Sequence, residues 1–244
     1  MFFINLLETE PLFKYVAEGA RVSLNFPDYY SQLLLPHRAG PWYFAPMALP
    51  VTPRKALVVL AHPATTGFNQ AIADQAVAAL KQNFDVDFLD LYRESFDPVI
   101  PGEELPRKFS FDETVLRFQG LVEKAEVLVF VHPDWWGGMP AILKGFIDRV
   151  FRPGVAYEYD GYEFLSKKKK MLFTGKKAFV FSTTDYAAPQ GDDPTATIWK
   201  RNIFSYCGIN DAQIHTFYDT YNSTYEARHH WIESVGQKIT GALT

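Results

Sequence analysis

Cysteine is nearly absent from this chain of 244 residues, which contains only Cys207. A single cysteine forms no internal disulfide and no cysteine cage for a metal ion, and it fits a reducing compartment. Apolar runs of the roughly 18–20 residues that cross a bilayer are also missing. The apolar segment 2–7 is short, has no basic segment before it and is followed by Glu8, so we expect no signal peptide. We therefore expect a cytoplasmic protein without a transmembrane segment.

An excess of positive charge is missing too, because Lys and Arg total 24 against 28 Asp and Glu, a formal net charge of −4. Nucleic acid binding relies on a strongly basic face, so we expect no nucleic acid partner. Two phosphate-binding signatures are absent as well. The segment after the first predicted strand contains neither G-x-G-x-x-G nor G-x-x-x-x-G-K-[ST], which removes the usual dinucleotide fingerprint and the P-loop.

Aromatic residues, in contrast, are abundant, with 21 Phe, 13 Tyr and 5 Trp making up 16% of the chain. Such an excess indicates heavy core packing, a large interface or a pocket for a flat ligand. The predicted strands and helices place four phenylalanines on core faces: Phe130, Phe151, Phe179 and Phe181.

Residues 1–53 differ in composition from the rest of the chain. The first 50 contain 10 aromatics and six of the 16 prolines but only seven charged side chains. Prolines that recur this often disfavour long helices and central strands, yet the segment is too apolar for ordinary disorder. We predict an irregular N-terminal arm with one helix around 11–20, which covers apolar surface on the main domain or on a partner subunit. A partly disordered tail is the alternative.

Residues 54–244 alternate between strand and helix patterns. The run 56–61 is continuously apolar, as expected of a strand covered on both faces, whereas 86–91 alternates and indicates a strand near a sheet edge. This alternation predicts an α/β fold with a five-stranded parallel sheet and helices on both faces. The predicted strands are 56–61, 86–91, 127–131, 178–182 and 213–217, and the predicted helices are 69–82, part of 109–124, 140–151, 197–206 and 225–239.

Parallel sheets bind ligands beyond the carboxyl ends of their strands, near the point where the strand order reverses. The first such segment is 61–69, where Thr65, Thr66 and Asn69 supply small polar groups at a helix N-terminus that attracts phosphate. His62 adds a further donor. Simple capping of the helix by Thr66 or Asn69 is the structural alternative.

Two further segments follow the central strands. In 132–140, Trp135 and Trp136 stand beside two glycines, which let a flat ligand approach the backbone and its N–H groups closely. The alternative is that one of the tryptophans packs under the loop as core. His132 and Asp134 have too few companions for a metal site. The segment 182–186 supplies hydroxyl and N–H donors that face the same edge of the sheet.

The run 140–151, preceded by 136–138, resembles the signature of the NAD(P)H:quinone oxidoreductases with a flavodoxin-like fold. His62 followed by 67–69 is similar to that family's flavin-diphosphate loop. Residues 183–184 and 207–208 fall where the family has the same residues. The resemblance covers roughly residues 54–240, and the first 50 residues have no counterpart in it.

The resemblance implies a flavodoxin-like domain in a dimeric flavoprotein that usually holds FAD, with FMN possible, and uses NAD(P)H as co-substrate at the subunit interface. By matching positions, the diphosphate and ribityl end is assigned to His62, Thr66, Phe68 and Asn69. The isoalloxazine is assigned to Pro133, Asp134, Trp135, Trp136 and Gly137, and its pyrimidine edge to Thr183, Thr184 and Asp185. Tyr157 and Tyr159 match family tyrosines that reach toward the partner's substrate pocket.

One segment departs from the family pattern. Members carry a Gly-Gly pair after the two threonines, then a Tyr and a His that assist hydride transfer. Here Asp185 and Tyr186 follow the threonines, and no histidine occurs between His132 and His215, so the catalytic histidine is missing. Tyr186 is a candidate for a similar donor role.

The lysine run and the single cysteine each allow a structural and a functional interpretation. The lysine run 167–170 is either a solvated loop or an attraction for the extra phosphate of NADPH. Cys207 is expected to be a small buried hydrophobic residue and not a nucleophile.

The sequence therefore predicts a flavin-dependent NAD(P)H oxidoreductase that passes two electrons through bound flavin to a quinone or similar acceptor. One alternative is a flavin-binding regulatory subunit of a membrane transporter, a role that some relatives have and that an exposed apolar arm would suit. The other is a flavodoxin-type electron carrier. The lengthened chain and the pair Tyr157 and Tyr159 argue for a substrate pocket and against the carrier.

Overall fold

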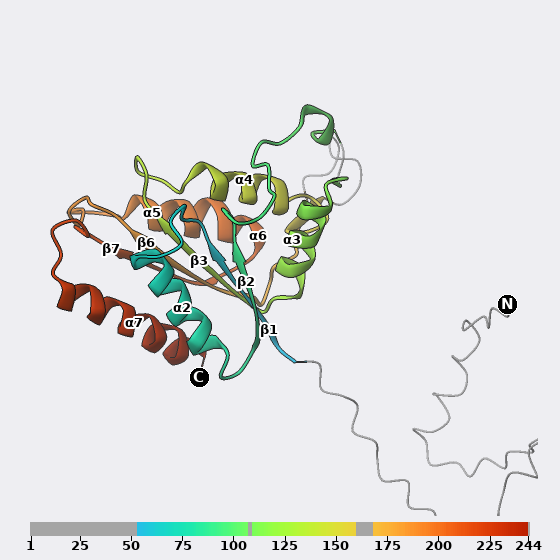
Figure 1. Ribbon diagram of the computed structural model, residues 1–244. Helices are drawn as coiled ribbons and strands as arrows, with labels where there is room; N and C mark the ends of the chain where they lie inside the picture. Colours follow the sequence, from blue (N-terminus) through green and yellow to red (C-terminus); the bar gives the residue numbers. More distant parts are fainter. Residues whose placement is uncertain (1–52, 107–108, 160–167, 244) are drawn as a thin grey trace, which may run out of the picture. The chain divides into compact units, whose positions relative to one another are not determined.

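The computed structural model describes residues 53–106, 109–159 and 168–243, and its centre is one five-stranded sheet (Figure 1). All strand pairs are parallel, and the spatial order is β2-β1-β3-β6-β7. The strands are β1 (Lys55–Leu60), β2 (Asp85–Asp90), β3 (Val127–Pro133), β6 (Lys177–Thr183) and β7 (Asp211–Phe217). The predicted parallel sheet is confirmed, with β2 at an edge as expected. The predicted helix at 11–20, like the arm up to residue 52, lies outside the described residues.

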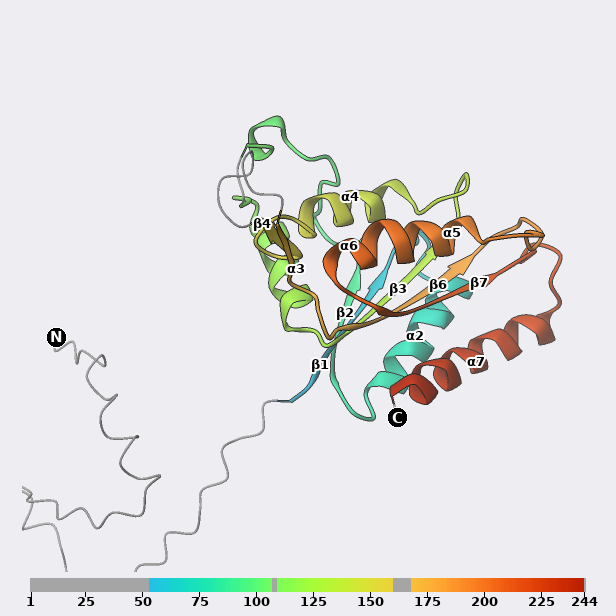
Figure 2. The same ribbon diagram turned by 180° about the vertical axis from the view of Figure 1, so that it is seen from behind.

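Helices cover both faces of the sheet (Figures 1 and 2). On one face, α2 (Phe68–Leu80) and α7 (Tyr225–Leu243) pack against each other. On the other face lie α3 (Glu113–Lys124), α4 (Ala141–Val150) and a helical stretch made of α5 (Pro194–Thr197), the π-helical η3 (Ile198–Phe204) and α6 (Ser205–Cys207).

The sheet separates two hydrophobic cores. Along β1, Leu57 and Val59 face the α3–α4 side, whereas Ala56, Val58 and Leu60 face the α2–α7 side. Side chains on a strand point alternately to opposite faces, so a strand with helices on both faces must be apolar at every position. This is the reason that the continuous apolar run correctly predicted a central strand.

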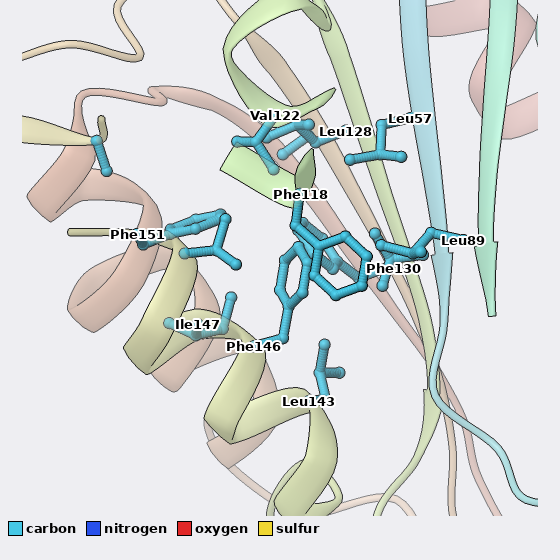
Figure 3. Close-up of a cluster of buried hydrophobic side chains, with 14 of the residues drawn as sticks. Leu57, Leu89, Phe118, Val122, Leu128, Phe130, Leu143, Phe146, Ile147 and Phe151 are labelled. Atoms are coloured by element: carbon cyan, nitrogen blue, oxygen red, sulfur yellow. The ribbon is translucent and has the colours of Figure 1, made fainter. Parts of the chain in front are cut away.

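Aromatic rings fill the core on the α3–α4 side (Figure 3). The Phe146 ring centroid lies 5.7 Å from that of Phe118 and 6.3 Å from those of Phe130 and Phe151. Aromatic pairs at such separations add stability beyond the area that they bury. The four phenylalanines assigned to core faces by the sequence are confirmed as buried: Phe130, Phe151, Phe179 and Phe181.

A cluster of buried charges holds the long connection between β2 and α3 against α4. Glu104 lies in the short 3-10 helix η2 (Gly102–Glu104), and its carboxylate receives Arg149 Nη2 at 3.0 Å, Arg152 Nη1 at 3.3 Å and Ser110 Oγ at 2.6 Å. Arg149 also pairs with Asp112 at 3.1 Å. We call these five residues the Glu104 cluster. Buried charges are tolerated only when paired and hydrogen-bonded in this way.

Two elements differ from the sequence-based expectation. The helix predicted at 197–206 begins three residues earlier, because Asp193 caps α5 by accepting from Thr195 N at 2.8 Å and Ala196 N at 3.3 Å. An antiparallel pair of short strands, β4 (Tyr157–Tyr159) and β5 (Lys169–Met171), was not predicted.

Candidate active site

The three predicted loops meet at the carboxyl edge of the sheet. Backbone hydrogen bonds join them, from Ala61 N to Val131 O at 2.9 Å and from Asp134 N to Thr183 O at 2.7 Å. The Asn69 amide donates to Thr183 Oγ1 at 3.0 Å, which links the first loop to the third. The chain runs outward from β1 to β2 and then back through β3 to β7, so the strand order reverses between β1 and β3. The convergence predicted from topology is confirmed.

The first loop leaves the N-terminus of α2 without a side-chain cap. Gly67 occupies the N-cap position with φ of 121°, and no side chain bonds to the first-turn N–H groups there. The alternative that Thr66 or Asn69 caps the helix is therefore wrong. Thr66 is exposed, and His62 Nδ1 accepts from Ala64 N at 3.2 Å. Uncapped N–H groups at a helix start are suited to hold an anion.

The ring of Phe68, the first residue of α2, contacts aromatic residues of β7 and α7. Its centroid lies 5.8 Å from that of Phe217 and 5.9 Å from that of Trp231, so the ring packs between β7 and α7. A contact between Phe68 and a cofactor stays a prediction.

The second loop turns sharply through a strained backbone. Trp136 has φ of 59° and Gly137 has φ of 79°, while Trp135 N donates to Gly138 O at 2.8 Å. A bulky residue in the left-handed region is uncommon and marks stored strain, which concentrates at functional sites. Trp136 is 96% exposed and Trp135 is 42% exposed, so the alternative that one of them packs as core is wrong. The loop presents aromatic surface outward.

Asp134 lies between that turn and the sheet in an unfavourable electrostatic setting. Burial raises the pKa of its carboxyl, the N–H groups of Gly137 and Gly138 oppose this, and the nearby Asp193 carboxylate raises it further. One of its two oxygens, Oδ1, is buried and has no hydrogen-bond partner among the described residues.

The third loop is fixed through its backbone and Thr184. Thr184 N donates to Phe217 O at 3.0 Å, and Tyr186 N donates to Thr184 Oγ1 at 3.2 Å. Asp185 Oδ1 accepts from Thr220 Oγ1 at 2.7 Å. Thr183 and Thr184 are buried, whereas the Tyr186 side chain is 57% exposed.

A hollow of about 180 Å³ opens beside these loops. It is smaller than the roughly 300–1,000 Å³ typical of ligand clefts, so it fits one end of a flat ligand and not a whole cofactor. Its lining includes four polar residues that the sequence did not single out. They are Asp193, Thr195, Thr216 and Tyr218.

The missed residues form one network. Asp193 Oδ2 accepts from Thr216 Oγ1 at 2.7 Å, while its Oδ1 caps α5. Burial, followed by the interaction with Asp193, raises the pKa of Tyr218 to about 12. Asp193 carried a usable signal, because Asp before Pro marks a helix start. Tyr218 carried none, since one residue past a strand end forms no motif.

His132 is a structural residue behind the hollow. It is fully buried, its Nε2 accepts from Trp199 Nε1 at 3.1 Å, and its Nδ1 lies 2.9 Å from Pro133 O. These partners require a neutral ring with its proton on Nδ1. Burial lowers the pKa of His132 to about 4. Within the described residues, His, Cys, Asp and Glu form no group of three that could hold a metal ion.

Tyr157 and Tyr159 are not brought to this hollow within one chain. Tyr157 lines a separate depression of about 230 Å³ with Tyr206 and Cys207, and Tyr159 Oη lies 2.7 Å from Tyr206 Oη. Cys207 is 2% exposed, so its expected burial is confirmed, and burial raises the pKa of its thiol to about 11. Lys169 lies 3.2 Å from the centroid of the Tyr206 ring.

The lysine run is only partly solvated. Lys169 also donates to Tyr206 O at 2.8 Å, whereas Lys168 and Lys170 are exposed. Lys167 lies outside the described residues. An attraction for the NADPH phosphate stays a prediction.

Comparison with known proteins places this fold in a family. The sequence pattern of the flavodoxin-like fold matches residues 54–239, so the chain belongs to that family. An uncharacterized NAD(P)H oxidoreductase of Haemophilus influenzae is 32% identical over 195 residues, which cover 77% of this chain and 95% of that protein. NAD(P)H dehydrogenase (quinone) 1 of Cavia porcellus is 36% identical over 151 residues, which cover 54% of this chain and 53% of that enzyme.

A solved structure gives the same result. Smu.1420 from Streptococcus mutans UA159 has a TM-score of 0.66 at 32% identity and covers 75% of this chain and 97% of its own. The predicted flavodoxin-like fold and the resemblance to NAD(P)H:quinone oxidoreductases are confirmed, and with them the prediction of an oxidoreductase. In the part of the chain that the structure describes, no helix is long and apolar enough to span a membrane.

Proposed function

We propose that this protein is a flavin-dependent oxidoreductase that passes two electrons from NAD(P)H through a bound flavin to a quinone or a similar acceptor. The observation that carries the proposal is the meeting of three polar loops at the carboxyl edge of β1, β3 and β6, where the second and third loops border a hollow. Relatives named NAD(P)H oxidoreductase and NAD(P)H dehydrogenase (quinone) support the same reaction class.

The residues at this edge fit a flavin. An added Cβ at Gly67 or Gly137 would have no atom within 4 Å, so a ligand can approach the backbone at both loops. The uncapped start of α2 suits the diphosphate, and Trp136 offers an exposed ring for stacking. The buried, unpartnered oxygen of Asp134 adds a polar group that a ligand can satisfy.

Each predicted residue receives a role in this proposal. His62, Thr66 and Asn69 hold the diphosphate and ribityl end, and Phe68 fixes the helix start. Residues 133–137 would hold the isoalloxazine, and Thr183, Thr184 and Asp185 would bind its pyrimidine edge. When bound, the flavin supplies hydride transfer between the nicotinamide and the acceptor. Backbone N–H groups of these loops would stabilise negative charge on that edge.

We further propose that the bound flavin is FAD, that the active form is a homodimer and that the protein is located in the cytoplasm. The separation of Tyr157 and Tyr159 from the hollow of their own chain supports the dimer, because they can then contribute to the substrate pocket of a second copy. Tyr186, exposed at the rim of the hollow, is the proposed donor that assists hydride transfer.

The test uses the purified full-length chain. We expect a yellow protein that releases FAD on denaturation, bleaches with NADPH under anaerobic conditions and is reoxidised by menadione with multiple turnovers. A colourless protein that binds neither FAD nor FMN would contradict the proposal. Bleaching without turnover on any quinone would favour the regulatory subunit. Sedimentation analysis and a parallel assay with NADH decide the oligomeric state and the preferred nicotinamide.

A further inference from the structure

The hollow beside the third loop contains two carboxylates with opposite hydrogen bonding. Asp193 accepts from Thr195 N, Ala196 N and Thr216 Oγ1 at 2.8, 3.3 and 2.7 Å, so both of its oxygens are occupied. Asp193 is therefore the fully hydrogen-bonded carboxyl group of the pair.

Asp134 has the opposite environment. Its Oδ1 is buried without a partner, although the side chain lines the hollow. The titratable groups that line the same hollow are Asp193, Tyr186 and Tyr218, and no cation is among its lining residues. His132, two residues earlier on β3, is held neutral. When two carboxyl groups share a site whose environments differ, the less stabilised one takes up the proton.

We propose that Asp134 is the proton donor for the second half of the reaction, an inference that rests on the proposed function. A hydride brings two electrons and one proton to the quinone and leaves the monoanion of the hydroquinone. The O–H bond of the Asp134 carboxyl then breaks as the second O–H bond of the hydroquinone forms. Asp134 is left as a carboxylate beside Asp193, and this repulsion draws a replacement proton from water.

The hydrogen bonds around Asp134 leave one of its two oxygens without a partner. The N–H groups of Gly137 and Gly138 approach the carboxyl and position it. The oxygen without a partner remains to carry the proton. Burial and the neighbouring Asp193 both raise the pKa of Asp134, which favours a proton at that oxygen.

The first test compares two acceptors in the flavin-loaded Asp134→Asn protein. Menadione needs a proton for each two-electron reduction, whereas ferricyanide takes one electron and no proton. We expect menadione turnover to fall by about 100-fold or more, the usual contribution of general acid catalysis. Ferricyanide turnover per bound flavin should fall much less than menadione turnover, because electron transfer to ferricyanide needs no acid.

Asp192→Asn is the matched control, since Asp192 is exposed, adjacent to Asp193 and outside the lining of the hollow. It should leave both acceptors unaffected. Equal loss on both acceptors in Asp134→Asn, or no loss on menadione, overturns the inference.

The second test needs no turnover and uses the unsubstituted chain. Carbon-13 labelling of aspartate allows the side-chain carboxyl of Asp134 to be titrated by NMR and assigned by its loss in Asp134→Asn. We expect a midpoint above the ordinary value of 3.8. A midpoint at or below 3.8 overturns the inference even if the variant fails to bind flavin.

The two proposals fail in different ways. A wild-type protein that binds no flavin, or is not bleached by NAD(P)H, contradicts the proposed function and takes the role of Asp134 with it. A wild-type protein that reduces menadione, beside an Asp134→Asn protein that does so equally well, contradicts the role of Asp134 alone.

Discussion

The Glu104 cluster and the hollow at Asp134 both place carboxylates inside the protein, but only the first satisfies them. Glu104 receives two guanidinium groups and a hydroxyl, and only Nε of Arg149 lacks a partner in that cluster among the described residues. Asp134 has an unpartnered oxygen and another carboxylate for a neighbour. We infer that paired buried charge holds the scaffold, whereas the carboxyl group of Asp134, with one unpartnered oxygen beside a hollow, is available for chemistry.

Removing the charge of Glu104 should have the largest effect on stability. Glu104→Gln leaves Arg149 and Arg152 buried without the carboxylate that they share. We expect the free energy of unfolding to fall by about 3–5 kcal/mol, as when one partner of a buried ion pair is lost. Urea denaturation measures this, and the exposed neighbour Glu103→Gln is the control. A loss no greater than that of Glu103→Gln would show that the cluster does not hold the connection.

A second substitution tests the packing of the connection between β2 and α3 on α4 by adding a methyl group, without changing any charge. Gly145 faces Pro98 so closely that an added Cβ would lie 2.3 Å from the Pro98 Cβ. Gly145→Ala should therefore cost about 1–3 kcal/mol, the usual cost of overpacking. Gly120→Ala on α3, where an added Cβ meets nothing within 4 Å, should gain up to about 1 kcal/mol from helix propensity. Equal effects of the two substitutions would contradict the close packing of the connection on α4.

The pH dependence of the free energy of unfolding should distinguish His132, whose ring nitrogens both have partners, from Asp134, which has an unpartnered oxygen. The folded pKa of His132, about 4, lies below its ordinary 6.5, so its stabilising contribution is present above 6.5 and is lost as the pH falls toward 4. The folded pKa of Asp134 is raised, so its contribution works the other way and is lost as the pH rises through that pKa.

Asp134→Asn should consequently not lower the free energy of unfolding at pH 7, and it should make the loss toward pH 4 larger than in the wild type. Urea denaturation series of both proteins across this range measure the effect. A constant difference between wild type and variant over the whole range would contradict the assignment of a raised pKa to Asp134.

Hydrophobic periodicity correctly predicted those strands and helices whose apolar positions are the positions buried in the core. The strand at Val127 is buried along its whole length and the helix at Ala141 buries one face, so their apolar patterns report their surroundings directly. The short strands at Tyr157 and Lys169 pair only with each other and are three residues long. A pattern of three residues is too short to separate a strand from a loop.

The candidate site was predictable where a loop directly follows a central strand. Topology alone brings residues 61–69, 132–140 and 182–186 together, because the carboxyl ends of parallel strands share one edge. Topology does not tell which side chains face inward, so the exposure of both tryptophans and the partnership of Asp193 with Thr216 required the structure. Single residues such as Tyr218 belong to the site only through the fold.

The most direct measurement is the carboxyl NMR spectrum of the chain labelled in aspartate and glutamate, recorded with and without FAD. If the unsatisfied carboxyl marks the flavin site, FAD should move the Asp134 resonance and leave that of Glu104 in place. An Asp134 resonance that stays unchanged at saturating FAD, or a Glu104 resonance that moves as far, would contradict the account.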